Sequence, residues 1–184
     1  MNSPPKTGSK IVRIELRLRE LAQLFNSLDP SPFIDRDLDP NAEEFIKGWA
    51  REHHQEAEFE LALHLAVPPP PDRAQGVEEA VRHYFAARAE VKRRQFRQLM
   101  RRGRISLFIG LVFLTACLFL SEVVSKLGYG AAAEIVRESL LIGGWVAMWR
   151  PLEIYLYDWW PLREDRRLVE RLARMQVRLI LPQT

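Results

Sequence analysis

Three aspartates alternate with other residues in the segment DRDLDP, at positions Asp35, Asp37 and Asp39. Side chains two positions apart in an extended backbone point to the same side, so the three carboxylates could together bind Mg²⁺ or Ca²⁺, with His64 as a further ligand. The segment lacks the glycine and the closing glutamate of an EF-hand loop. Asp39 also stands directly before Pro40, where aspartate commonly caps a helix. A divalent-metal site is therefore one interpretation, and a helix cap after a series of turns is the simpler one.

A second set of polar residues interrupts an apolar block that runs from Ser139 to Tyr157. Arg150 and Glu153 are three positions apart, so a helix would bring them together as an ion pair, and Tyr157 falls on the same stripe. A charge inside a membrane helix costs about 2.5 to 3.5 kcal/mol, which makes such a pair unusual. Three interpretations stay open: a transport or proton-relay site, a pair that reaches toward lipid headgroups at the cytosolic interface, or a polar contact within an oligomer.

The remaining residue types form no catalytic pattern. The histidines lack the spacing of a zinc hydrolase, and the chain has no nucleophile elbow, dinucleotide-binding glycine motif or phosphate-binding loop. Cys117 is the only cysteine, which excludes an internal disulfide and a thiolate metal cluster. We therefore expect no cofactor, and the sequence favours a protein without catalytic activity over an enzyme.

The chain has two apolar segments, and the first of them is the clearer candidate for a membrane helix. Residues 105–124 begin with the uncharged run ISLFIGLVFLTACLFLS and are long enough to cross a bilayer core. The thirteen residues before them, 92–104, hold seven Lys or Arg and no acid. A polybasic flank marks the cytoplasmic side of a membrane helix, and each basic side chain near an anionic leaflet contributes on the order of 1 kcal/mol. We expect four of these side chains to contact lipid headgroups: Arg97, Arg101, Arg102 and Arg104.

The second apolar segment, residues 139–160, predicts a helix that returns across the membrane. The basic residues that follow it would then lie on the same side as the first basic flank. Tryptophan and tyrosine gather near its end, as is typical of a membrane interface. We therefore expect a two-helix transmembrane hairpin in the inner (plasma) membrane of a bacterial cell, with both termini in the cytoplasm.

Alternating apolar residues predict a small sheet outside the apolar segments. The strands are expected near 11–19 and 58–67, with a third strand near 175–181. Together with the helices described next, they give an α+β fold.

Two predicted helices complete the soluble part. One begins at Pro40 and ends near His54, with an apolar stripe made of Ala42, Phe45, Ile46 and Trp49. The other begins near Val77, and nothing in the sequence breaks it before Gly103, so it could run directly into the bilayer.

The predicted organisation of the chain follows from these elements. It consists of a flexible tail (1–10), a cytosolic α+β domain (11–91), a basic juxtamembrane helix (92–104), a first transmembrane helix (105–124), an external link (125–138), a second transmembrane helix (139–160) and a cytosolic C-terminal helix with a strand (161–184).

Charge and composition narrow the function classes. The net charge of +3 is small, and the basic residues gather beside an apolar run, which argues against binding of nucleic acid. We expect membrane lipids and a protein partner or a second copy of the chain as binding partners. The predicted function is that of a non-catalytic scaffold or subunit. The alternatives are a membrane-tethered enzyme or divalent-metal sensor that uses the three aspartates, and an accessory subunit of a transporter that uses the Arg150–Glu153 pair.

Overall fold

The computed structural model describes residues 11–53, 58–127 and 130–181, and the chain divides into two compact units. Unit 1 consists of two separate stretches, Met1–Lys92 and Asp165–Thr184. Unit 2 is the stretch between them, Arg93–Glu164.

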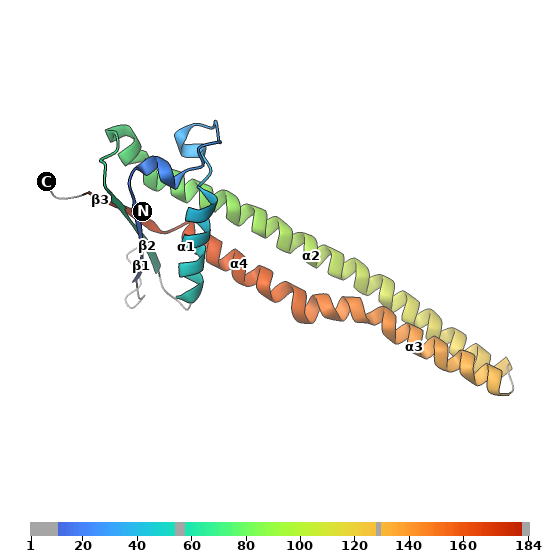
Figure 1. The fold of residues 1–184 in the computed structure, drawn as a ribbon. Helices are drawn as coiled ribbons and strands as arrows, with labels where there is room; N and C mark the ends of the chain where they lie inside the picture. Colours follow the sequence, from blue (N-terminus) through green and yellow to red (C-terminus); the bar gives the residue numbers. More distant parts are fainter. Residues whose placement is uncertain (1–10, 54–57, 128–129, 182–184) are drawn as a thin grey trace, which may run out of the picture. The chain divides into compact units, whose positions relative to one another are not determined.

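A parallel three-stranded sheet forms the centre of unit 1 (Figure 1). Strand β1 is Ile11–Leu18, β2 is Glu58–Leu65 and β3 is Gln176–Ile180, in the spatial order β1-β2-β3. The register pairs Leu61 of β2 with Ile14 on one side and with Val177 on the other. The three predicted strands are thus confirmed, including the one near the end of the chain.

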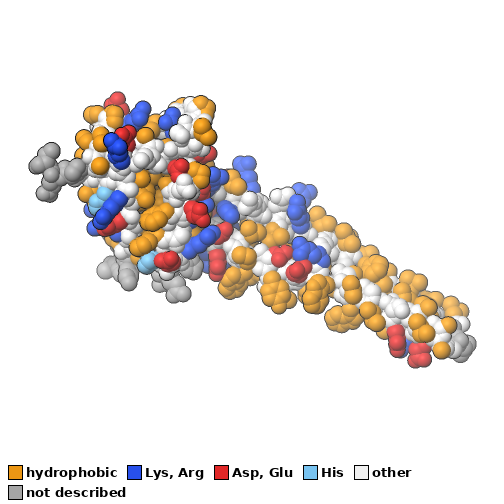
Figure 2. Space-filling model, in the orientation of Figure 1, with side chains coloured by type: hydrophobic (Ala, Val, Ile, Leu, Met, Phe, Trp, Pro, Cys, Tyr) orange, Lys and Arg blue, Asp and Glu red, His pale blue; other side chains and the backbone are white. Residues whose placement is uncertain are grey.

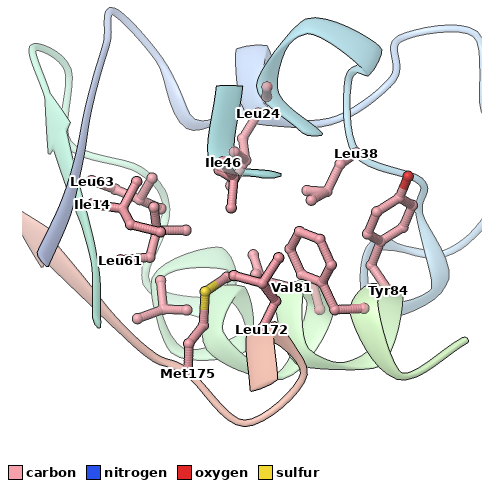
Figure 3. Close-up of a cluster of buried hydrophobic side chains, with 14 of the residues drawn as sticks. Ile14, Leu24, Leu38, Ile46, Leu61, Leu63, Val81, Tyr84, Leu172 and Met175 are labelled. Atoms are coloured by element: carbon pink, nitrogen blue, oxygen red, sulfur yellow. The ribbon is translucent and has the colours of Figure 1, made fainter. Parts of the chain in front are cut away.

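One face of the sheet carries the core of unit 1. Ile14, Leu61 and Leu63 point from the strands toward the side chains of the surrounding helices (Figure 3). Burial of this continuous apolar cluster is the main contribution to the stability of the sheet. The helices contribute Ile46, Val81, Tyr84 and Leu172, among others, and Met175 adds to the core from the position just before β3.

The central strand β2 is more buried than the alternation of apolar and other residues in its sequence predicts. Glu60 and Ala62 lie on the face away from the core, yet they are only 5% and 1% exposed. Neighbouring strands on both sides shield them, and Glu60 accepts from Arg13 Nε at 2.8 Å and lies 3.2 Å from Arg178 Nε. The buried carboxylate is therefore paired from both flanking strands.

Helix α1, Pro40–Glu52, begins as the sequence predicts. The Asp39 carboxylate accepts from the backbone N–H of Asn41 at 2.9 Å and of Ala42 at 3.3 Å, which caps the helix. The buried stripe is different from the predicted one, because Ala42, Ile46 and Ala50 face the core. The other two predicted members, Phe45 and Trp49, are 44% and 40% exposed and stack on each other with ring centroids 6.3 Å apart.

Helix α2, Pro71–Leu127, is continuous over 57 residues. It begins at Pro71 rather than near Val77, because proline fits the first turn of a helix, where no N–H donor is needed. Among the described residues it is the one helix that is long and apolar enough to cross a membrane.

The second predicted span is not a single regular helix. Helix α3 is Ala131–Glu153, a π-helical segment follows at Ile154–Asp158, and α4 is Trp159–Leu172. Residues 139–160 therefore comprise the end of α3, the π-helical segment and the start of α4. Charged residues at both ends of α3 keep it below the hydropathy of a clear membrane span: Glu134, Arg137, Glu138, Arg150 and Glu153.

Candidate functional site

Glycines of α2 and α3 lie in the contact between these two helices within unit 2. A Cβ added to Gly110 would lie 3.1 Å from the backbone oxygen of Ala147, and one added to Gly144 would lie 2.8 Å from Leu114 Cδ1 and 3.3 Å from Cys117 Cβ. Cys117 is itself only 4% exposed. The two backbones therefore approach each other closely, which only small side chains at these points permit.

Large apolar side chains lie on the outside of the same two helices. Figure 2 shows hydrophobic side chains over much of this surface. Apolar residues that are more than half exposed are found on α2, on α3, on the π-helical segment and at the start of α4. They include Ile105, Phe108, Ile109, Leu111, Val112, Phe119, Ile135, Ile142, Trp145, Val146, Trp149, Leu156, Tyr157 and Trp160.

This arrangement is the reverse of a helix pair that is stable in water. In water, large apolar residues would fill the contact and small or polar ones would face the solvent. In a bilayer, lipid solvates the apolar exterior, and small residues that allow close backbone packing favour helix association. Unit 2 has such glycine contacts between its helices and large apolar side chains on its outside.

A charged cluster lies at the end of α3. Arg150 Nη1 donates to Glu153 Oε2 at 2.7 Å and lies 3.5 Å from Asp158 Oδ2. The predicted Arg150–Glu153 pair is present. Tyr157 is 70% exposed, and Asp158 rather than Tyr157 faces Arg150.

The π-helical segment explains this change of partner. In a regular α-helix, the residue seven positions after Arg150 would return to the same face. The i→i+5 turns of Ile154–Asp158 are wider and delay that return by about one residue, which brings Asp158 into line. Pro151 stands just before this segment, where its missing N–H weakens the regular hydrogen-bond ladder.

The contacts between α2 and α3 show where the charged cluster lies along the two helices. A Cβ on Gly103 would lie 2.9 Å from Ile154 Cγ2, whereas Gly110 faces Ala147 and Pro151. Arg150 is therefore level with α2 residues between these two glycines, where the apolar run starts. The cluster lies at the edge of the apolar surface rather than at its middle, so its charges can reach outward to polar surroundings.

The predicted headgroup contacts all lie on one stretch of α2. Arg101, Arg102 and Arg104 are exposed and directly precede the apolar run, and Arg97 lies about one turn earlier. The buried residue among them is Gly103, the point of contact with Ile154.

The three aspartates proposed as metal ligands lie in unit 1 and have separate roles. Asp39 caps α1, and Asp35 Oδ1 lies 3.5 Å from Nδ1 of His83. Asp37 donates its backbone N–H to the carboxylate of Asp29 at 2.7 Å. Within the described residues, no group of three or more His, Cys, Asp or Glu side chains is arranged to hold a metal ion.

The sequence pattern does not predict a hydrogen-bonded cluster that lies between α1 and α2. The Tyr84 hydroxyl donates to Glu43 Oε2 at 2.8 Å and accepts from Arg88 Nε at 3.0 Å, and Lys47 also pairs with Glu43. Burial raises the pKa of Glu43, but the hydrogen bonds from Lys47 and Tyr84 outweigh it and lower the pKa overall. Burial raises the pKa of Tyr84, and its bond to the Glu43 carboxylate adds to this.

A second such cluster joins both stretches of unit 1. Asp165 of α4 accepts from Arg51 Nη2 at 3.1 Å and from Lys92 Nζ at 3.0 Å. Partial burial raises the pKa of Asp165, but the bonds from Lys92 and Arg51 lower it overall. The Lys92–Asp165 pair holds together the two points at which the chain leaves unit 1 and returns to it.

A cavity of about 310 Å³ opens at the start of the strands, between Glu58, Glu60, Arg171 and Arg174. The Arg171 guanidinium lies 4.5 Å from the centre of the Phe59 ring, and burial lowers its pKa. Among the described residues, its lining consists of charged, amide and apolar side chains.

Comparison with models of known families, with curated proteins and with solved structures found no match in any of the three.

Proposed function

We propose that this chain is a two-pass membrane protein in which α2 crosses the bilayer, α3 returns, and unit 1 lies at the cytoplasmic surface. The observation that carries this proposal is the pairing of β2 with β3. β2 precedes the apolar helix and β3 follows it, yet both belong to one sheet. A crossing by α2 alone would separate these strands by a membrane. An apolar α2 in lipid therefore requires an even number of crossings.

The packing of unit 2 supports a return by α3 despite its charged ends. Its uncharged stretch between Glu138 and Arg150 has eleven residues, which span about 16 Å. α2 shields the face of α3 that contains Gly144, and Arg150 is neutralised by Glu153 and Asp158 at the edge of the apolar surface. A long basic side chain at that depth can place its charge among the headgroups.

The orientation follows from the basic flank. Arginines gather before Ile105, at the end of α2 that leads to unit 1, and basic flanks are retained on the cytoplasmic side. Unit 1 and both termini would then be cytoplasmic, in the inner (plasma) membrane of a bacterial cell.

In this arrangement the chain acts as a non-catalytic scaffold or subunit that holds unit 1 at the membrane and associates with a partner or with itself. The support is the charged cluster Arg150, Glu153 and Asp158, which lies on the exposed side of its helix next to Trp149 and Leu152. Polar groups at such a position can form specific contacts between membrane helices.

Reporter fusions at both ends of the full-length chain test the topology. Green fluorescent protein fused to either terminus is expected to fluoresce, and alkaline phosphatase fused to either terminus is expected to be inactive. The chain should also stay in the membrane pellet after carbonate extraction. Reporters that place the termini on opposite sides, or a chain released by carbonate, would refute the proposal.

The same charged cluster favours a second candidate, an accessory subunit of a transporter. Crosslinking in native membranes separates it from the scaffold. Replacing both charges, R150M/E153M, should abolish the crosslinked complex if the pair is an assembly contact. If it serves transport, the complex should persist while flux is lost.

A further inference from the structure

Three arginines on α2 have no acidic partner among the described residues. Arg101, Arg102 and Arg104 are exposed, and within the described part of the chain none of them forms a salt bridge or a side-chain hydrogen bond. The nearby charges at the end of α3 are already paired, because Arg150 contacts both Glu153 and Asp158. The excess positive charge at this level of unit 2 therefore belongs to α2.

The contact at Gly103 sets the direction of these three side chains. Gly103 faces Ile154 so closely that an added Cβ would lie 2.9 Å away. Because successive residues in an α-helix are about 100° apart, Arg102 and Arg104 lie about 100° to either side of this direction and Arg101 about 160° from it. All three point away from α3, so they are open to an external ligand.

The depth of the three arginines suits the phosphate of a lipid. They occupy about one helical turn, roughly 4.5 Å along the axis, immediately before the exposed apolar side chains that begin with Ile105 and Phe108. A ligand that fits here has an anionic group beside a long apolar part. Guanidinium groups bind phosphate through paired hydrogen bonds, which makes arginine well suited to this contact.

We propose that Arg101, Arg102 and Arg104 form a binding site for the headgroup of anionic phospholipids, and that they select these over zwitterionic lipids around α2 because a zwitterionic headgroup adds a cation beside its phosphate. The inference rests on the proposed membrane insertion. It adds a lipid specificity that a merely apolar anchor would not have, since zwitterionic lipids solvate apolar side chains equally well.

Lipid retention by the full-length protein tests this site. The protein is reconstituted in vesicles with equal amounts of phosphatidylcholine and phosphatidylglycerol, released into detergent and analysed by native mass spectrometry. The wild-type chain is expected to retain phosphatidylglycerol roughly a hundredfold over phosphatidylcholine, because each of the three basic side chains near an anionic headgroup contributes on the order of 1 kcal/mol. The variant R101Q/R102Q/R104Q should retain both lipids about equally.

A matched control removes the same charge elsewhere. R17Q/R19Q/R73Q replaces three exposed arginines of unit 1 and should keep the wild-type preference. R101K/R102K/R104K keeps the charge and should preserve most of the preference. If the triple glutamine variant does not accumulate, the three single glutamine variants should each show a partial loss.

Equal retention of both lipids by the wild-type chain would overturn the proposal, and so would an equal loss of preference in the control variant. Carbonate extraction of the same preparations separates this failure from that of the proposed function. A chain that stays in the membrane without lipid preference refutes only the lipid site, whereas a chain released by carbonate refutes the membrane anchor itself.

Discussion

Single carboxylates hold the irregular segment between β1 and α1 in place. Asp29 accepts from the backbone N–H of Ser31 through Oδ1 at 2.9 Å and from that of Asp37 through Oδ2 at 2.7 Å. These bonds favour the charged form and lower the pKa of Asp29 from 3.8 to about 2. The bond from Asp37 has the largest effect. The Asp29 side chain thus links the backbone at Ser31 to the backbone at Asp37.

The variant Asp29→Asn should destabilise unit 1 in a pH-dependent way. The folded pKa lies below the unfolded one, so the stabilisation is complete above about pH 4 and is lost as the pH falls toward about 2. An asparagine offers only one acceptor oxygen and therefore loses one of the two bonds. Urea midpoints followed by circular dichroism should differ most between wild type and variant at pH 7, and the difference should shrink between pH 4 and 2. A difference independent of pH would contradict this account.

The variant Tyr84→Phe should destabilise the contact between α1 and α2. It removes one donor to the partly buried Glu43 carboxylate and the acceptor of Arg88 Nε, at an expected cost of about 1 to 2 kcal/mol. Hydrogen exchange of the α1 amides in the detergent-solubilised chain measures this loss. Arg82→Gln is the control, because the exposed Arg82–Glu78 pair is worth less than about 1 kcal/mol. Faster exchange in the control than in Y84F would refute the assigned role.

At the scale of elements, adjacent glycines of α3 have different environments. An added Cβ at Gly144 meets Leu114 and Cys117, whereas at Gly143 nothing lies within 4 Å. Gly144→Leu should therefore separate α2 from α3, and Gly143→Leu should leave them together, although both changes have the same effect on helix propensity.

Cys117 is a natural reporter for this prediction, because it is buried in the same contact and is the only cysteine of the chain. N-ethylmaleimide should modify Cys117 in detergent roughly ten times faster in G144L than in wild type, as an opened contact exposes the thiol. G143L should react at the wild-type rate. Equal rates in the two leucine variants would show that α3 does not pack on α2 through Gly144.

The sequence predicts those elements whose signal is local. Alternation identifies β1 and β2, and Asp39 with Pro40 identifies the start of α1, because the strand pattern and the helix cap depend on adjacent residues. The π-helical segment has no such signal. Because of this segment, Arg150 faces Asp158 instead of Tyr157. The exposure of Phe45 and Trp49 likewise depends on how α1 lies against the core, which residue spacing does not determine.

At the scale of the whole molecule, unit 2 is an insertion within unit 1. The stretches of unit 1 end at Lys92 and Asp165, whose side chains are 3.0 Å apart. A Gly/Ser linker of about eight residues can therefore replace residues 93–164, since it extends to roughly 26 Å.

The shortened chain is expected to fold and to stay in the supernatant after centrifugation. Its core and its sheet belong to unit 1 alone, and the large exposed apolar side chains of α2 and α3 are removed. Trp49 becomes the only tryptophan, so its fluorescence reports folding directly. A linker variant without a cooperative unfolding transition would show that unit 1 depends on the insertion.

The position of β3 determines when this protein can finish folding during its synthesis. The ribosome makes β2 about 110 residues before β3, a delay of roughly 5 to 20 s at ordinary rates of translation. During that interval one edge of the central strand has no neighbour. In the proposed two-pass topology, the sheet is completed only after the apolar helices have been inserted, so a polypeptide stalled before that step would present an open strand edge to chaperones and proteases.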